Sequence, residues 1–405
     1  MLGAGPGDDG GRVLRILTFS TLYPNAARPQ HGVFVENRLR HLVAGGRVAA
    51  TVVAPVPWFP FRGDRFGRYA GFAHAPAEEE RFGIPVRHPR YPLLPKIGMT
   101  VAPYLLYRAV RPDIERWMRE GAEVDLIDAH YFYPDGVAAA LLGRALGLPV
   151  TITARGTDLN LLPRYALPRR MIRWAAGEAA GLITVCAALK ARLVALGVAA
   201  DRVTVLRNGV DLAQFTLGDR AAARAHLGLS GPVLLSVGHL IPRKGHDVAV
   251  EALAEIPEAT LLIAGEGPEE KSLRNLVHRN GLEGRVRFLD AVPYADMAAL
   301  YRAADVLVLA SSREGWANVL LEAMACGTPV VASDVWGTPE VVAAPEAGRL
   351  MAARTPAAAA AAIRALLDNP PDRAATRAYA EGFGWEETTE GQVRLFNRIL
   401  GRDAP

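Results

Sequence analysis

The feature that most constrains the fold is a repeated alternation of short apolar, β-branched runs with segments of helical length. This alternation is typical of parallel sheets flanked by helices. A first series of expected strands covers residues 13–19, 50–56, 125–129, 150–154, 181–185 and 203–206. A second series covers residues 233–237, 260–264, 286–289, 306–310 and 329–332. Two doubly wound α/β sheets in series are the simplest account of this order.

The length of 405 residues allows two sizeable domains, each with its own core. A turn signal at Asn208-Gly209 and a helix opening at Gly218-Asp219 predict the boundary within residues 207–218. The expected parts are a disordered tail at 1–11, a first Rossmann-like domain at 12–210, a second Rossmann-like domain at 211–383, and a closing helix within 384–405 that returns to the first domain.

The cysteine content argues against a disulfide framework or a zinc site. Cys186 and Cys326 are the two cysteines, and they lie far apart without CxxC spacing. The first ten residues carry acids where a signal peptide has bases, and no apolar run reaches the roughly 18 residues of a membrane span. We expect a cytoplasmic protein.

The charge is divided unevenly along the chain. Residues 1–205 contain 26 basic and 17 acidic residues, a net charge of +9, whereas the remainder contains 20 and 25, a net charge of −5. A basic first half can face a phosphate-bearing acceptor or the anionic inner face of a membrane, although chance variation explains the split equally well. The segment 56–69 interleaves aromatic and basic residues, which suits peripheral membrane contact or a loop packed on its own aromatics.

The strongest constellation of chemical groups spans residues 312–331. Glu314 is expected in a strand-to-helix loop, with Asn318 at the start of the helix and Glu322 one turn inside it. A helix N-terminus suits an anion such as a diphosphate. Eight helical residues rise about 12 Å, so the two carboxylates would not share one atom but could accept hydroxyls from the sugar and the ribose of one donor. The alternative is a capping Glu314 and a Glu322 paired on the surface.

The loop 238–245 joins an expected strand to a helix and carries the adjacent cations Arg243 and Lys244. It lacks Gly-Lys-Ser/Thr, so it is not a Walker A loop. Two cations at a helix start are unfavourable without an anion nearby, which favours phosphate binding over two solvated charges.

Asp128 and His130 end an expected strand, at the edge where open α/β sheets bind ligands. Because side chains alternate along a strand, those of Asp128 and His130 lie on the same side of the sheet. A histidine assisted by a carboxylate is a candidate base, and a structural histidine is the alternative.

These segments together resemble the family 4 glycosyltransferases over nearly the whole chain. The family signature is a Glu, seven residues and a second Glu, followed by Ala-Met-Ala-x-Gly-x-Pro-Val-Val, and it is matched by Glu314, Glu322 and residues 323–331. The resemblance implies a GT-B fold, with two Rossmann-like domains and an interdomain cleft. The domain at 12–210 would then lie on the acceptor side, and the domain at 211–383 would bind the nucleotide sugar. It also implies retaining transfer from a UDP- or GDP-type sugar, with no cofactor and no metal.

The resemblance assigns roles to four catalytic candidates. Arg243 and Lys244 would neutralise the leaving diphosphate. Glu314 would hold the sugar, and His130 would contact it near the anomeric carbon. In such enzymes the leaving phosphate helps to take the acceptor proton, so no enzymic base is required.

Two loops depart from the family pattern. Gly32 is the expected donor contact in the first loop, where His31-Gly32 replaces the usual Gly-Gly. Arg155 replaces the usual histidine in Thr153–Asp158, and we assign it to a phosphate of the donor or acceptor with Asp158 positioning it.

Further donor contacts follow from the same resemblance. They are Gly238, Glu266, Val292, Gly315, Asn318 and Val319. The nucleotide base is expected near Val292, and Asp290 stands where the family usually has glycine.

The acceptor is expected to be a saccharide, and a lipid-linked saccharide of surface polysaccharide or glycolipid synthesis in particular. A sugar-nucleotide epimerase of similar fold is the alternative reaction. An NAD-dependent oxidoreductase is a third, opposed by the absence of Gly-x-Gly-x-x-Gly after the first strand.

Overall fold

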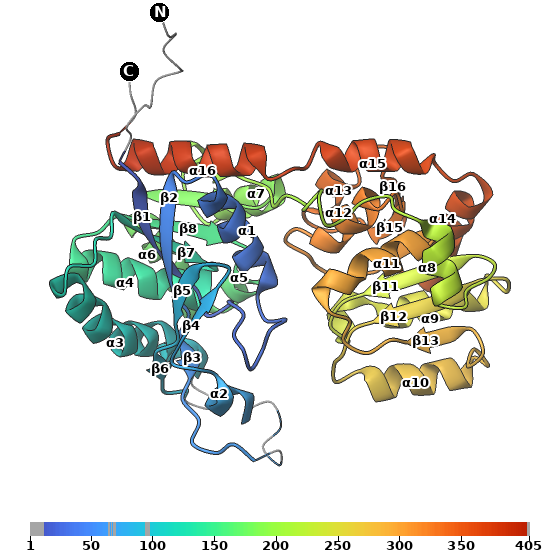
Figure 1. Cartoon of the computed structure of the whole chain (residues 1–405), viewed down its shortest axis with the longest axis horizontal. Helices are drawn as coiled ribbons and strands as arrows, with labels where there is room; N and C mark the ends of the chain where they lie inside the picture. Colours follow the sequence, from blue (N-terminus) through green and yellow to red (C-terminus); the bar gives the residue numbers. More distant parts are fainter. Residues whose placement is uncertain (1–11, 64, 66, 68–69, 94–97, 403–405) are drawn as a thin grey trace, which may run out of the picture. The chain divides into compact units, whose positions relative to one another are not determined.

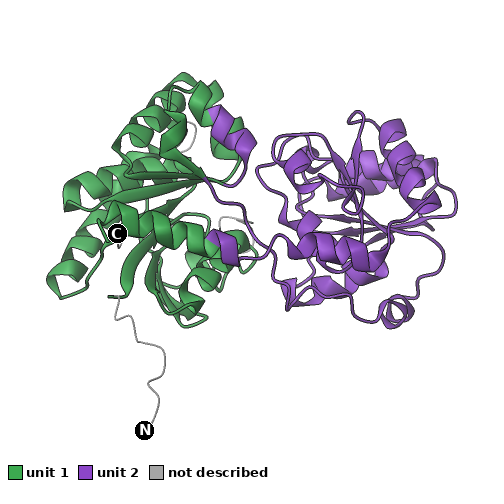
Figure 2. Cartoon of the chain, turned by 90° about the horizontal axis from the view of Figure 1, so that it is seen from above, with its two compact units in different colours: residues 1–184, 193–204, 389–405 green, residues 185–192, 205–388 purple. Residues whose placement is uncertain are grey.

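The computed structural model describes residues 12–402 apart from 64, 66, 68–69 and 94–97. The expected disordered tail at 1–11 lies outside the described residues, as do Phe66, Arg68 and Tyr69 of the aromatic segment. The chain divides into two compact units (Figure 2). Unit 1 consists of residues 1–184, 193–204 and 389–405, and unit 2 of residues 185–192 and 205–388. Helices flank the sheet of each unit (Figure 1).

The sheet of unit 1 has the order β10-β9-β8-β7-β1-β2-β5-β4. Its strands are β1 (Leu14–Phe19), β2 (Val48–Val53), β4 (Glu78–Arg81), β5 (Ile84–Arg87), β7 (Leu126–His130), β8 (Val150–Ala154), β9 (Gly181–Thr184) and β10 (Val203–Val205). The β4–β5 pair is antiparallel, whereas β1 pairs in parallel with both β2 and β7. The order of strands therefore reverses between β1 and β7, which makes the loops after these two strands the expected ligand side.

The helices of unit 1 follow the strands. They are α1 (Val33–Ala44), α2 (Ala70–His74), α3 (Gly98–Arg119), α4 (Val137–Leu146), α5 (Thr157–Asn160) and α6 (Ala166–Glu178). A short π-helix, η2 (Phe132–Gly136), follows β7, and 3-10 turns lie at η3 (Leu162–Arg164) and η4 (Ala200–Arg202). A two-stranded sheet pairs β3 (Val56–Pro57) with β6 (Arg90–Tyr91). The last helix, α16 (Glu386–Ile399), packs Val393 and Phe396 into the apolar core around β1 and β2.

The sheet of unit 2 has the order β13-β12-β11-β14-β15-β16, and its strand pairs are parallel. The strands are β11 (Val233–Val237), β12 (Thr260–Ala264), β13 (Val286–Phe288), β14 (Val306–Leu309), β15 (Val330–Ser333) and β16 (Gly348–Met351). This is the order of a Rossmann sheet, with its switch point between β11 and β14. The loops carrying Arg243-Lys244 and Glu314 follow these two strands.

The helices of unit 2 are α8 (Arg220–His226), α9 (His246–Ala254), α10 (Glu270–Arg279), α11 (Met297–Ala303), α12 (Asn318–Ala325), α13 (Thr338–Val341), α14 (Pro356–Asp368) and α15 (Arg373–Glu381). Short 3-10 turns lie at η5 (Pro242–Lys244) and η6 (Tyr294–Asp296). The four inner strands β11, β12, β14 and β15 are almost fully buried, so the core lies between the sheet and its helices.

The division into units differs from the predicted boundary at 210/211. Unit 2 begins at Val205 and also includes residues 185–192 at the start of α7 (Ala187–Ala195). The Glu340 carboxylate accepts hydrogen bonds from the amides of Ala187 and Ala188 at 3.0 and 3.1 Å. This contact ties the start of α7 to residues far along the chain, and no local sequence signal marks it.

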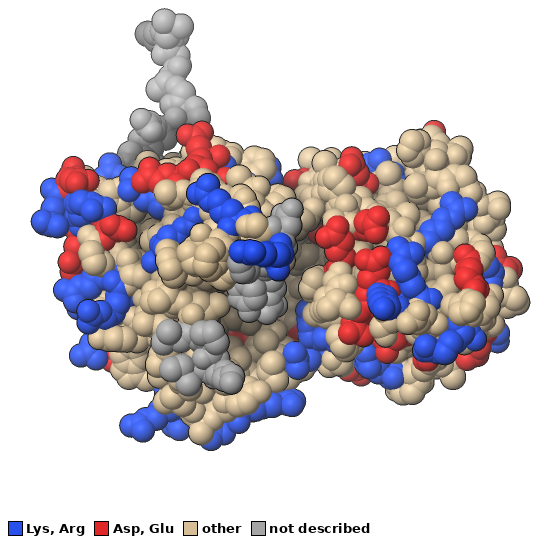
Figure 3. All heavy atoms as spheres, turned by 90° about the horizontal axis from the view of Figure 1, so that it is seen from below, with Lys and Arg blue, Asp and Glu red and all other residues tan. Residues whose placement is uncertain are grey.

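The charge difference between the halves does not give a surface of one sign. On the face drawn in Figure 3, basic and acidic side chains occur on both units. Within the described residues, no helix is both long enough and apolar enough to cross a membrane.

Candidate functional site

The loop after β11 is fitted closely against the end of β14. Gly245 has φ +74°, and a Cβ there would lie 2.0 Å from the carbonyl oxygen of Ala310. The amide of Ser312 donates to the Arg243 carbonyl at 2.8 Å. Glycine is therefore required between Lys244 and α9, both for the left-handed backbone and for the close approach.

The two loops bring three of the predicted residues together. Lys244 Nζ lies 2.7 Å and Arg243 Nη1 3.2 Å from Glu314 Oε1, which also accepts from Ser311 Oγ at 2.7 Å. Burial alone would raise the pKa of Glu314, but Lys244 and Arg243 outweigh it and lower the pKa. Glu314 is therefore ionised at neutral pH, and its charge is shared by two cations. We call Arg243, Lys244 and Glu314 the charge cluster.

Glu322 lies in a different environment. It is 7 % exposed, and its Oε2 accepts a hydrogen bond from the Tyr301 hydroxyl at 2.7 Å. Burial raises its pKa to about 7, although hydrogen bonds from Tyr301 and Tyr294 oppose the rise. The alternative of a Glu322 paired on the helix surface is wrong, because the side chain is buried and its partners are tyrosines.

Helix α12 begins at Asn318, as its sequence predicts, and leaves Glu314 in the preceding loop. No side chain caps its N-terminus. Asn318 Oδ1 accepts from Asn208 Nδ2 at 3.2 Å, while Gly315 is buried and Val319 half-buried. The first amides of α12 and the positive end of its dipole are therefore suited to an anion beside the charge cluster.

The ends of neighbouring strands in unit 2 approach one another through their backbones. A Cβ at Gly265 would lie 2.0 Å from the Gly238 carbonyl oxygen, so this approach requires glycine. Glu266 is exposed and Val292 half-buried. The Gly265 amide donates to the Asp290 carbonyl at 2.7 Å.

The backbone conformation at Asp290 explains why aspartate is accepted where the family usually has glycine. Its φ of +54° lies in the left-handed region, which glycine adopts freely and aspartate tolerates better than most residues. The side chain is exposed. The substitution therefore keeps the backbone path of the loop.

In unit 1 the His130 ring is held from both nitrogens. Arg155 Nη2 lies 2.6 Å from Nδ1, and Asp128 Oδ2 lies 3.2 Å from Nε2. Because arginine only donates, Nδ1 must accept and Nε2–H must donate to Asp128. Burial is the main cause that lowers the pKa of His130 to about 4. The ring is thus neutral in a fixed tautomer, and Asp128 and His130 lie on one side of the sheet as expected.

This network extends to the closing helix, a connection that the sequence did not reveal. Gln392 Nε2 donates to Asp128 Oδ2 at 2.9 Å, and Gln392 Oε1 accepts from Arg38 Nε at 2.9 Å. Thr151 Oγ1 donates to Asp128 Oδ1 at 2.7 Å. Gln392 and Arg38 are both 1 % exposed, so α16 inserts a polar side chain into the interior of unit 1.

Asp158 positions the loop of Arg155 through backbone amides. It accepts from the amides of Arg155 at 3.1 Å, Gly156 at 2.7 Å and Phe132 at 2.8 Å. The Arg155 guanidinium instead contacts His130 and lies 5.6 Å from the centre of the Phe34 ring. Burial and then repulsion from Arg38 lower the pKa of Arg155.

The loop that carries Gly32 is fixed by a close backbone approach and by contacts of the His31 ring. Gly32 has φ +77°, and a Cβ would lie 2.3 Å from the Leu22 carbonyl oxygen. His31 Nδ1 contacts Arg28 Nη2 and its Nε2 contacts the Thr21 carbonyl, each at 3.1 Å. In this chain His31 therefore braces the loop that leads into α1.

Asp135, which was not singled out from the sequence, also fixes this region. Its Oδ2 accepts from the Thr21 amide at 2.7 Å, joining the loop after β1 to η2. Burial raises the pKa of Asp135 to about 7. Its position directly after Tyr133-Pro134, in the segment that follows β7, was the available signal.

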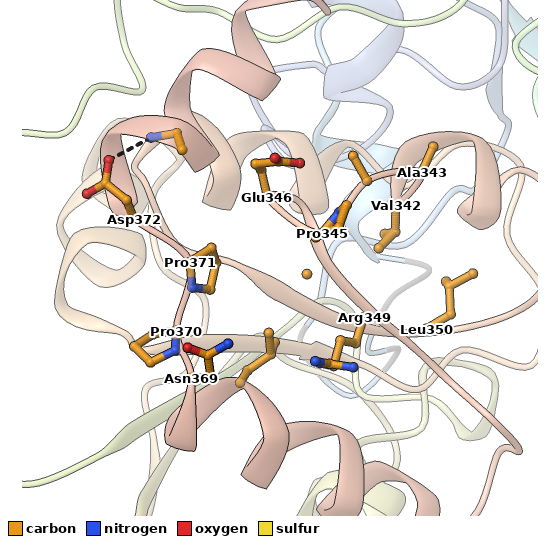
Figure 4. A pocket seen from close by; sticks show the side chains of 14 residues that line it. Val342, Ala343, Pro345, Glu346, Arg349, Leu350, Asn369, Pro370, Pro371 and Asp372 are labelled. Atoms are coloured by element: carbon orange, nitrogen blue, oxygen red, sulfur yellow. Dashed lines mark hydrogen bonds between the residues drawn. The ribbon is translucent and has the colours of Figure 1, made fainter.

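A pocket of about 610 Å³ lies elsewhere in unit 2 (Figure 4). It is formed before and along β16 and by the connection from α14 to α15. Its lining includes Glu346, Arg349, Asn369 and Asp372 and none of the predicted site residues. It lies at the amino end of β16, whereas the charge cluster follows the carboxyl ends of its strands.

Both halves of the chain match family models. Residues 219–383 match the model described as glycosyl transferases group 1, and residues 32–214 match glycosyltransferase family 4. The chain is 33% identical over 320 residues to D-inositol 3-phosphate glycosyltransferase 1 of Catenulispora acidiphila, covering 71% of this chain and 76% of the relative. It is 34% identical over 305 residues to the D-inositol 3-phosphate glycosyltransferase of Frankia alni, covering 68% and 74%.

Solved structures share the fold. Sucrose-phosphate synthase from Thermosynechococcus elongatus superposes with a TM-score of 0.79 at 21% identity, covering 97% of this chain and all of that one. Anabaena HepE, solved in complex with UDP-glucose, gives a TM-score of 0.71 at 20% identity, covering 96% of this chain and all of that one.

Proposed function

Because the chain belongs to the family 4 glycosyltransferases and has their GT-B fold, we propose that it transfers a sugar, with retention, from a nucleoside diphosphate sugar to a hydroxyl acceptor. The donor would be of the uridine or guanosine type, and no metal would be required. The epimerase and oxidoreductase alternatives are not retained, because the family match favours glycosyl transfer.

The observation that carries the proposal is the charge cluster at the switch point of the unit 2 sheet. Arg243 and Lys244 are adjacent cations beside the uncapped start of α12. The two cations, the first amides of α12 and the positive end of its dipole can all interact with one anion. A diphosphate bound there would have the negative charge that develops on its leaving oxygen stabilised, which is the electrostatic task that a metal performs in other transferases.

The two carboxylates fit different hydroxyls. Glu314 is ionised, and its Oε1 is already held by Lys244, Arg243 and Ser311. A fixed carboxylate of this kind accepts hydrogen bonds from sugar hydroxyls. Glu322 would hold the ribose, with Tyr301 keeping its carboxyl group in place.

We propose that no side chain of the His130 network acts as a base. Both ring nitrogens are occupied, and burial holds the ring neutral. In retaining members of the family the leaving phosphate helps to take the acceptor proton. The family resemblance assigns His130 and Gly32 to the donor. Because His130 is 1 % exposed and contacts Arg155, it would act by holding the Arg155 guanidinium in place.

The acceptor would carry a phosphate, for which Arg155 is the candidate partner. The relatives' names indicate a phosphorylated polyol, D-inositol 3-phosphate. A lipid-linked saccharide is the second candidate and shares the phosphate chemistry.

The direct test incubates the enzyme with a panel of nucleotide sugars and follows release of the nucleoside diphosphate by mass spectrometry. Hydrolysis requires no acceptor, so the donor is identified first. Inositol 3-phosphate, unphosphorylated inositol and a lipid-linked saccharide are then compared as acceptors. Release from none of the sugars would refute the proposed donor class, and an inverted anomer by NMR would refute retention.

A further inference from the structure

Helix α6 of unit 1, labelled in Figure 1, has several basic side chains on its exposed face. The helix buries Pro168, Ile172, Ala175 and Ala176 against unit 1. Its opposite side exposes Arg169, Arg170 and Arg173. Arg164 and Tyr165, directly before the helix, are exposed as well. These residues, together with Leu167, are called the α6 surface below.

The arginines of the α6 surface have no acidic partner among the residues that the structure describes. Residues 161–177 contain four arginines and no acid. Within the described residues, none of these four arginine side chains forms an ion pair or a hydrogen bond. Three exposed arginines elsewhere in unit 1 have carboxylate partners, in the pairs Arg12–Glu123, Arg47–Glu390 and Arg116–Asp113. The α6 surface is therefore a local excess of positive charge that the part of the chain described by the structure does not neutralise.

The same arginines line a pocket. It has a volume of about 490 Å³ and is bordered by Arg169, Arg170 and Arg173, by Trp174, and by residues 196–198. Arginine binds phosphate oxygens in a bidentate manner, and three guanidinium groups around one pocket suit a phosphate-bearing group.

Apolar side chains accompany the charges. Tyr165 is 48% and Leu167 42% exposed, and both lie at the beginning of the helix beside the arginines. A soluble phosphate compound would satisfy the arginines but leave these side chains in water. A lipid surface satisfies both, because tyrosine and leucine enter the interfacial region while arginine heads meet the phosphates.

We propose that the α6 surface docks on an anionic membrane, with lipid phosphates seated in the arginine pocket. The surface lies on unit 1 and shares no residue with the donor site proposed on unit 2. The docking is thus independent of the donor assignment. The α6 surface is also separate in sequence from the segment 56–69, where the sequence predicts a membrane contact. In that segment Trp58 and Phe61 are 59% and 51% exposed.

The experiment is sedimentation of the full chain with vesicles of phosphatidylcholine, alone or with about one-third phosphatidylglycerol. The wild type should bind the anionic vesicles and not the neutral ones, and high salt should release it. Each basic residue near such a surface strengthens binding about fivefold, so Arg169→Gln/Arg170→Gln/Arg173→Gln should lower the partition coefficient on the order of 100-fold.

The matched control, Arg12→Gln/Arg47→Gln/Arg116→Gln, removes the same charge from paired arginines and should bind nearly as the wild type does. A double variant, Tyr165→Ser/Leu167→Ser, should also weaken binding, and melting temperatures show whether each variant is folded. Equal loss in the control, or wild-type binding by the arginine variant, would overturn the proposal. Binding of glycerol 3-phosphate without binding of vesicles would identify a soluble phosphate as the occupant and overturn it too.

Discussion

Replacement of Lys244 by alanine removes one cation from the charge cluster. The Lys244 side chain is 15% exposed and its Nζ lies 2.7 Å from Glu314 Oε1. After the change Glu314 keeps Arg243 at 3.2 Å and Ser311 at 2.7 Å. The buried carboxylate therefore loses one of three partners and is not left isolated.

The loss of one partner of Glu314 determines how much stability and how much activity Lys244→Ala should lose. Loss of a charged hydrogen bond to a buried group costs about 1–3 kcal/mol, less than the about 3–5 kcal/mol for a buried charge left wholly unpaired. Loss of one preorganised group that stabilises developing charge lowers kcat about 10²–10³-fold. We expect Lys244→Ala to fold with a lower melting temperature and to lose nearly all transfer.

The assay is release of nucleoside diphosphate from the donor, with the melting temperature measured by circular dichroism. Lys271→Ala, at an exposed lysine of α10, is the control and should match the wild type. Turnover of Lys244→Ala at the wild-type rate would refute the assignment of the cluster to the leaving group.

Three further predictions concern Glu322, Gly265 and Gln392. The donor KM should rise as the pH falls below about 7, because the ribose needs the ionised form of Glu322, whose pKa is about 7. Because of that raised pKa, the free energy of unfolding should fall by up to about 3 kcal/mol as the pH rises from about 4.5 to above 7. Glu322→Gln should therefore be more stable than the wild type at pH 8.5 in urea titrations. A difference in stability between variant and wild type that is the same at acid and alkaline pH would contradict this. Gly265→Ala, with φ +144° and a Cβ 2.0 Å from a carbonyl oxygen, should destabilise the fold by about 2–4 kcal/mol in urea titrations, whereas Gly284→Ala, with no atom within 4 Å, should be neutral. Gln392→Ala removes a hydrogen-bond partner from both Arg38 and Asp128 and should lower the free energy of unfolding by about 2–4 kcal/mol. The control Glu390→Gln changes an exposed ion pair and should lower it by about 0–1 kcal/mol. Equal losses in the two variants would argue against the buried network.

The sequence predicted those parts of the fold that local patterns encode. The start of α12 at Asn318 follows from the loop glycine at 315 and the apolar run behind it. The shared side of Asp128 and His130 follows from strand alternation. The strands of unit 2 were expected within one or two residues, except β16, which was missed because its four residues include a glycine and an arginine.

The parts that were missed depend on contacts between distant segments. The strand β4 has the sequence Glu-Glu-Glu-Arg, so no apolar alternation marks it, and its pairing with β5 defines it. Tyr301 reaches Glu322 because α11 and α12 lie together, and Gln392 reaches Asp128 across 264 residues. Such partners are set by packing, and a pattern within one segment does not encode them.

The central claim is that the charge cluster and Glu322 form the donor site of a glycosyltransferase. A crystal structure with UDP or GDP bound tests it most directly. We predict diphosphate oxygens within hydrogen-bond distance of Arg243 and Lys244, and ribose hydroxyls on the Glu322 carboxylate. A nucleotide bound elsewhere, for example in the pocket beside Arg349 and Asn369, with the charge cluster unchanged, would contradict the account.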